Sequence, residues 1–134
     1  MATTQKTDTI VWPTLIYADA PAALRWLAEA FGFEEALVVP GDGEGVVAHA
    51  ELRWPLGGGV MLGSIRSDSV LGEQQAGATS VYVVTDEPDA LFERCTAAGA
   101  EVVMGLYDAD YGSRGFTVKD PEGNIWSFGT YRGA

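Results

Sequence analysis

The chain has few of the residues that build disulfides and transition-metal sites. Its 134 residues include one cysteine, Cys95, and one histidine, His49. A single cysteine cannot form an internal disulfide, which fits a cytoplasmic protein. Zinc, iron and nickel sites need imidazole, thiolate or carboxylate ligands, so the residue count alone excludes a histidine-rich site. A magnesium or calcium site built only from carboxylates stays open.

Positive charge and long apolar runs are also scarce. Eight Lys and Arg residues stand against nineteen Asp and Glu, which gives a formal net charge of −11. This balance disfavours nucleic acid and anionic membranes as partners, and it suits either a cationic ligand or simply solubility. No apolar stretch approaches the roughly 20 residues that span a bilayer, and residues 1–9 lack the apolar core of a signal peptide. We expect a flexible lead over residues 1–9 and a single domain over residues 10–134, located in the cytoplasm.

What the sequence does contain is a repeat. The stretch YADAPAALRWLAEAFGFE matches VTDEPDALFERCTAAGAE, which starts 67 positions later. Each copy has an Asp suited to cap a helix, a Pro suited to the first turn and a Gly suited to the left-handed residue past the end. These pairs are Asp19 and Asp86, Pro21 and Pro88, and Gly32 and Gly99. The pattern predicts two helices of about three turns, with Cys95 as a small buried residue of the second.

Short apolar runs bounded by turn residues predict the strands. They cover residues 10–18, 35–39, 45–54 and 58–64 in the first half, and 79–85, 101–107, 114–119 and 124–131 in the second. Each half therefore reads β-α-β-β-β, giving modules 10–64 and 79–132 joined by residues 65–78. One such unit cannot bury its apolar face alone, so the two should pair. We predict an α+β fold, a curved eight-stranded mixed sheet or open barrel with the helices on its convex face.

The strand over residues 45–54 predicts a functional face by its alternation. One set of side chains is uniformly apolar and should face the helices; the other should face the concave side: Val47, His49, Glu51 and Arg53. His49 with Glu51 beside it is a candidate catalytic acid–base pair, because imidazole titrates near neutrality. The alternative is a partly exposed histidine without a catalytic role. Arg53 suits either an anionic ligand group or a salt bridge at the rim.

Two further features bear on ligand binding and assembly. The stretch YDADYGSRG, residues 107–115, contains Tyr111 and Arg114, which are candidates to close over a ligand because Tyr stacks on planar or cationic groups. An ordinary solvated hairpin loop is the alternative. Trp26, on the first predicted helix, is expected to pack against the sheet edge or a partner subunit.

The paired modules resemble a known group of proteins. The segments YADAPAALRWLAEAFGF, ALFERCTAAGAEV and above all DPEGNIWSF are similar to the vicinal-oxygen-chelate superfamily, which includes glyoxalase I, extradiol dioxygenases, fosfomycin-resistance proteins and bleomycin-binding proteins. The resemblance covers residues 10–131. It implies an open barrel whose concave side holds the site. It is specific for the fold and weak for activity, because one fold hosts many chemistries.

The resemblance also implies where a metal would bind. In metal-using members four strand positions offer His or Glu to a divalent cation, and here they fall on Trp12, Met61, Ser127 and Thr79, or on Ser80 after a shift of one residue. Indole, thioether and hydroxyl groups are poor ligands for such a cation. We therefore expect neither a metal nor another cofactor. With Thr14, these side chains should form a ligand-binding cup with an aromatic wall, while Trp126 and Phe128 point into the core.

Several functional hypotheses follow. The first is a metal-independent protein that binds or sequesters a small aromatic or cationic compound. It would be a homodimer, because the resemblance to drug-binding members places the ligand between two subunits. The second is a lyase, isomerase or hydrolase that uses His49 and Glu51 for proton transfer. A divalent-metal glyoxalase-like enzyme and a dimerising module without a ligand are the remaining alternatives.

Overall fold

The computed structural model describes residues 11–66, 75–110 and 112–133, so the predicted lead and Tyr111 lie outside it. Within this part of the chain the element order is β-α-β-β-β, twice. The first module contains β1 (Thr14–Tyr17), α1 (Ala20–Phe31), β2 (Glu34–Pro40), β3 (Val47–Arg53) and β4 (Gly59–Ser64). The second contains β5 (Ser80–Val84), α2 (Pro88–Ala97), β6 (Glu101–Asp108), β7 (Arg114–Lys119) and β8 (Ile125–Gly129).

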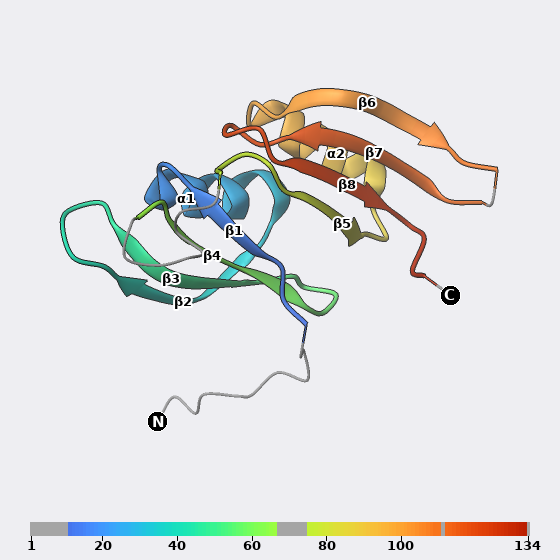
Figure 1. Ribbon diagram of the computed structural model, residues 1–134. Coiled ribbons are helices and arrows are strands. Elements are labelled where there is room, and N and C mark those ends of the chain that lie inside the picture. Colours follow the sequence, from blue (N-terminus) through green and yellow to red (C-terminus); the bar gives the residue numbers. More distant parts are fainter. Residues whose placement is uncertain (1–10, 67–74, 111, 134) are drawn as a thin grey trace.

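The strands form two four-stranded mixed sheets with the same topology. Sheet A has the order β1-β4-β3-β2 and sheet B the order β5-β8-β7-β6. In each sheet the first and last strands of the module are parallel neighbours, and the other pairs are antiparallel. Figure 1 shows the two sheets with β2 and β6 as outer strands. The predicted α+β fold with two β-α-β-β-β modules is confirmed, with its eight strands divided between two sheets.

The start and end of α1 follow the sequence signals closely. The Asp19 side chain accepts a hydrogen bond from the Ala22 backbone N–H at 3.1 Å, so the predicted cap is present. Pro21 stands in the first turn, where a missing N–H leaves no bond unmade. Gly32 ends the helix in the left-handed conformation, with φ of 91°, which a residue without a Cβ adopts readily.

The second helix begins one residue later than the repeat predicts. Glu87, and not Asp86, occupies the N-cap position of α2, and its side chain makes no capping hydrogen bond. The Asp86 carboxylate instead accepts a hydrogen bond from Arg132 Nη2 at 2.7 Å. The expectation that Asp86 caps this helix is therefore wrong, because a neighbouring cation engages the carboxylate.

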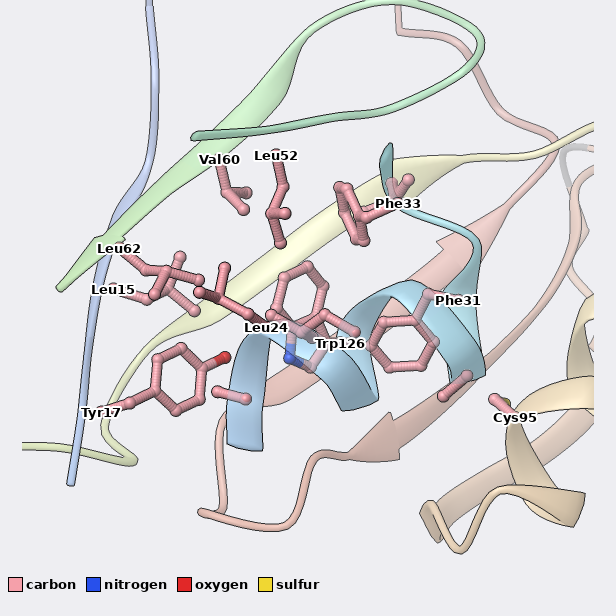
Figure 2. Close-up of a cluster of buried hydrophobic side chains, with 14 of the residues drawn as sticks. Leu15, Tyr17, Leu24, Phe31, Phe33, Leu52, Val60, Leu62, Cys95 and Trp126 are labelled. Carbon is pink, nitrogen blue, oxygen red and sulfur yellow. The ribbon is translucent and has the colours of Figure 1, made fainter. Parts of the chain in front are cut away.

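The core is an aromatic cluster shared by both modules. Phe31 at the end of α1 lies 5.2 Å from Trp126 and 4.8 Å from Phe128 of sheet B, measured between ring centroids. Phe33 lies 5.6 Å from the same Trp126 ring. Figure 2 shows the rings of Phe31, Phe33 and Trp126 together with Leu52 and Val60 of sheet A. Each sheet thus buries its helix-facing side against the same cluster, and the prediction that Trp126 and Phe128 point into the core is confirmed.

A buried carboxylate organises the turn between β7 and β8. Asp120 Oδ1 accepts the backbone N–H groups of Glu122 and Asn124, each at 3.0 Å, which closes the D-P-E-G-N turn. Asp120 Oδ2 accepts from the Tyr17 hydroxyl at 2.7 Å, the Trp126 indole at 3.0 Å and the Asn124 amide at 3.1 Å. Asp120 is 4% exposed. Burial, and next the charge of Asp120, raise the pKa of Tyr17.

The same turn is tied to the start of α1. The Glu122 carboxylate accepts the backbone N–H groups of Ala18 and Asp19, at 2.6 Å and 2.8 Å. These contacts join residues 104 and 103 positions apart in the chain. Glu122 therefore links the last hairpin of the second module to the first helix of the first module.

The two helices also contact each other directly. Arg94 of α2 donates through Nε to the Glu29 carbonyl at 2.8 Å and through Nη2 to the Ala28 carbonyl at 3.1 Å, so it satisfies acceptors near the end of α1. Trp26 donates to the Ala98 carbonyl at 2.8 Å. Trp26 thus packs beside the end of α2, a contact that the sequence did not predict.

Two side chains test the predicted faces. Cys95 is fully buried, as predicted, and burial raises the pKa of its thiol to about 11. Val47, expected on the concave side with His49, is instead 5% exposed and belongs to the core. The cause is a register shift, because Val47 pairs with Pro40 while His49 pairs with the adjacent Val39. One extra residue in β3 turns Val47 to the opposite face.

Neither α1 nor α2 has the length and apolar character of a membrane-crossing helix, and this holds for all helices in the described residues.

Candidate ligand-binding site

Sheet A carries a row of predicted site residues on the face that the helices leave uncovered. Thr14 pairs with Met61, which pairs with Glu51, which in turn pairs with Leu37 on the outer strand. Directly paired residues point to the same side of a sheet. The neighbouring positions Leu52 and Leu62 are buried in the core. The row therefore lies on the side away from the helices, as the alternation predicted.

Trp12 and Arg53 extend this face by one more row. Arg53 pairs with Gly59, and a Cβ placed on Gly59 would lie 2.8 Å from the Trp12 ring. The indole therefore covers Gly59, where a larger residue would displace it. Arg53 is exposed and Trp12 is half-buried. The structure thus brings together the first-module residues that the sequence singles out.

His49 and Glu51 form a hydrogen-bonded pair. His49 Nε2 lies 2.7 Å from Glu51 Oε2, and their side chains are 38% and 28% exposed. Both are two positions apart on β3, so they share one face of the sheet. An imidazole held by a carboxylate can take up and release a proton while staying in one orientation. This geometry makes the pair a candidate acid–base group.

The second-module half of the site lies on sheet B. The Ser127 hydroxyl is 3.0 Å from the Thr117 hydroxyl, and Ser127 also pairs with Tyr82 of β5. Trp126 and Phe128, on either side of Ser127, are buried, so Ser127 points away from the core as predicted. The site residues are therefore divided between two sheets. Six lie on sheet A or just before it, and Ser127, Ser80 and Arg114 lie on strands of sheet B.

The register at β5 favours Ser80 over Thr79 on this face. Ser80 pairs with Ile125, two positions before the Tyr82–Ser127 pair, so it shares their side of the sheet. Thr79 precedes the strand, and its backbone N–H donates to Asn124 Oδ1 at 3.0 Å. The structure thus places Ser80, the alternative that the sequence allows, on this face in place of Thr79.

Arg114 is held by acidic neighbours. Its Nε donates to Asp89 Oδ1 at 2.7 Å, and its Nη1 donates to Asp108 Oδ2 at 3.1 Å. These hydrogen bonds lower the pKa of Asp89 and raise the pKa of Arg114. Arg114 thus ties the start of α2 to β6 and to its own strand. The other predicted residue of this segment, Tyr111, lies outside the described residues.

Sequence reasoning missed a set of exposed apolar side chains on the same faces. They occupy rows with Glu51 and His49 in sheet A and with Ser127 and Ser80 in sheet B: Leu37, Val39, Tyr82, Met104 and Ile125. Their exposed fractions run from 37% for Ile125 to 50% for Met104. Alternation alone hints at these positions, but the cross-strand register is needed to place them beside the site. Grouped apolar exposure of this kind is typical of a surface that binds something.

The residues at the four metal positions do not fit a divalent cation. Trp12 offers no lone pair, Met61 offers a soft thioether, and Ser127 and Ser80 offer neutral hydroxyls. His49 and Glu51 supply two ligand groups, and the described ranges contain no cluster of three or more His, Cys, Asp or Glu side chains suited to a metal ion. We therefore derive no chemistry through a metal at this site.

Two β-α-β-β-β modules, each with one sheet face packed on helices and one uncovered face bearing polar groups, define the class of the protein. Residues 9–128 match the sequence model of the Glyoxalase/Bleomycin resistance protein/Dioxygenase superfamily. The chain belongs to this superfamily.

Known relatives agree with this assignment. The crystal structure of TioX from Micromonospora sp. ML1 is 34% identical, with a TM-score of 0.74 over 90% of this chain and 97% of that one. A superfamily member from Sphaerobacter thermophilus is 20% identical with a TM-score of 0.67, covering 90% and 97%, and shows likeness of fold alone. An uncharacterized Mycobacterium bovis protein is 32% identical over 124 residues, which is 87% of this chain and 80% of the relative.

Proposed function

We propose that the chain is a metal-independent small-molecule-binding protein whose ligand lies against the uncovered sheet faces. The observation that carries this proposal is the composition of those faces. Exposed apolar side chains such as Leu37 and Met104 surround a few polar groups, including Glu51 and Ser127. Small-molecule sites typically combine a largely apolar lining with a few placed polar groups.

The ligand that suits these faces is a small aromatic or cationic compound. Trp12 and Tyr82 supply aromatic surfaces, on which planar and cationic groups stack. Glu51 supplies a carboxylate, and the chain as a whole carries a net charge of −11, which attracts cations and disfavours nucleic acid and anionic membranes. A cytoplasmic location belongs to the same proposal, since the single cysteine is buried and makes no disulfide.

A homodimer would complete the site. The predicted residues are split between two sheets whose helix-facing sides share one core, so neither uncovered face is closed by the described part of its own chain. The outer strand β6 also exposes apolar side chains that a second copy would cover: Val102, Val103, Met104 and Tyr107. In the proposed arrangement the uncovered sheet of one copy faces that of its partner, and the ligand lies between them.

The test is a titration with acridine orange, a planar aromatic cation, followed by dye fluorescence. The Met61→Lys variant introduces a solvated cation at the centre of the sheet A face. We expect the dissociation constant of the dye to rise about tenfold or more, which corresponds to about 1.4 kcal/mol. Glu29→Gln is the control, because it changes the net charge by the same amount on the exposed surface of α1. Its affinity should match the wild type.

Two results would contradict this proposal. If Met61→Lys and Glu29→Gln bind acridine orange equally well, the dye does not use the sheet face. Sedimentation equilibrium of the same samples checks the assembly, where we expect twice the chain mass of 14.2 kDa. A 14.2 kDa monomer that binds the dye with full affinity would rule out the dimeric site.

The 2.7 Å contact between His49 and Glu51 favours one second candidate, an enzyme that uses this pair for proton transfer in a hydrolase, lyase or isomerase step. For the hydrolase case, p-nitrophenyl acetate is the chromogenic probe. We expect His49→Ala to lower turnover about a hundredfold or more, which is the range of general acid–base catalysis, while acridine orange affinity stays unchanged. Equal ester hydrolysis by the wild type and His49→Ala would show that His49 is not a catalytic residue for this probe.

A further inference from the structure

A pocket lies on the helix side of the molecule, away from the uncovered sheet faces. It has a volume of about 270 Å³ and is formed between α1 and the turn that connects β7 and β8. Ala22, Trp26 and Leu27 of α1 make one wall, and Pro121 of the turn contributes to the other. This lining is apolar, and the volume is near the lower end of what small-molecule sites occupy.

All charged side chains that line this pocket are carboxylates. They are Asp19 at the start of α1 and Asp120 and Glu122 in the turn, and the lining contains no Lys, Arg or His. Asp19 uses Oδ1 to accept the Ala22 N–H, so Oδ2 stays outside that bond. An apolar pocket with a negative rim favours a ligand that joins an apolar body to a cationic head.

Three backbone N–H groups at the start of α1 already donate to carboxylates of the protein. The N–H groups of Ala18 and Asp19 donate to the two oxygens of Glu122, at 2.6 Å and 2.8 Å. The N–H of Ala22 donates to Asp19 at 3.1 Å. A helix start usually attracts anions through such free N–H groups. Here the protein's own carboxylates already occupy these three groups, so an anion would have to displace a carboxylate to use them.

Trp26, which lines the pocket together with Tyr17, has a fixed orientation. Its indole N–H donates to the Ala98 carbonyl at 2.8 Å, and its ring meets Phe31 edge-on at 5.0 Å between centroids. These two contacts restrain the ring from both modules. An indole held in this way offers a large, rigid apolar surface to the body of a ligand.

We propose that this pocket binds a small organic ammonium ion, with the apolar body between Trp26 and Pro121 and the charged head near Asp19. The site is separate from the sheet faces to which the acridine orange experiment refers. Each can therefore fail without the other.

The test uses phenethylammonium chloride as the probe and 2-phenylethanol as its uncharged analogue. Binding is followed by the indole N–H signals in ¹H–¹⁵N NMR spectra, and the Trp26 signal is assigned with Trp26→Phe. We expect phenethylammonium to shift the Trp26 signal and to bind several-fold more tightly than the alcohol. Met61→Lys should bind it like the wild type, because Met61 lies on the uncovered sheet face.

The charge requirement is tested with Asp19→Asn. Asn caps a helix about as well as Asp, so the fold and its unfolding midpoint should be retained. We expect this variant to bind phenethylammonium about fivefold more weakly, because the carboxylate charge beside the ammonium group is lost. Glu29→Gln removes one charge from the same helix outside the pocket and should bind like the wild type. Equal affinity for the ammonium and the alcohol, equal binding by Asp19→Asn, or an unmoved Trp26 signal would each overturn the proposal.

Discussion

Replacing Asp120 with alanine should lower the free energy of unfolding by at least about 5 kcal/mol, because it leaves five donors without a partner, each costing roughly 1–3 kcal/mol. The donors are the Tyr17 hydroxyl, the Trp126 indole, the Asn124 amide and the two backbone N–H groups of the turn. The measurement is urea denaturation of the variant and the wild type, followed by tryptophan fluorescence.

Tyr17→Phe is the matched control for this network, because it removes a single donor and leaves the others bound. It should cost about 1 kcal/mol. Burial raises the pKa of Tyr17 above its ordinary value of 10.0, so its contribution to stability is complete below that pH and is lost as the pH rises further. The phenylalanine variant should lack this part of the alkaline decline. A loss below about 1 kcal/mol for Asp120→Ala would show that the network does not stabilise the fold as described.

Removing the Phe31 ring should cost about 4 kcal/mol, within the range for large aromatic residues truncated in a core. Phe31 is 1% exposed and meets four other rings. Two of these, Trp126 and Phe128, come from the second module, so Phe31→Ala weakens the contact between the modules as well as the core. Urea denaturation reports the loss in unfolding free energy.

Leu56→Ala is the control for the core truncation, because Leu56 is apolar but 49% exposed. Its effect should stay within about 0.5 kcal/mol, as for other surface substitutions. If Phe31→Ala unfolds with a similarly small loss, the two sheets do not depend on a shared aromatic core.

The repeat carries most of the fold prediction. Asp19, Pro21 and Gly32 each take the structural role that their chemistry favours, and the order of strands follows from the turn residues between apolar runs. Asp86 shows the limit of such matching. It stands at the same repeat position as Asp19, yet a cation distant in sequence, Arg132, engages it. Local propensity cannot anticipate a long-range ion pair.

The site was predictable to the extent that strand alternation holds. Met61, Glu51 and Thr14 are neighbours in one row because each strand keeps its period of two. The bulge in β3 breaks that period and places Val47 in the core, and no residue type in the sequence marks the extra residue. The exposed positions Leu37 and Met104 needed the pairing register, which depends on how whole strands pack.

The hydrogen bonds that Ala18 and Asp19 donate to Glu122 have a consequence for the synthesis of the chain. The ribosome makes the start of α1 about a hundred residues before it makes Glu122, because the hydrogen-bonded residues are 104 and 103 positions apart in the chain. While the later segment is still being translated, the nascent first module exposes Phe31, the α1 side chain that Trp126 and Phe128 will contact. We therefore expect chaperones to bind α1 in that interval, and to dissociate once the β7–β8 hairpin has left the exit tunnel.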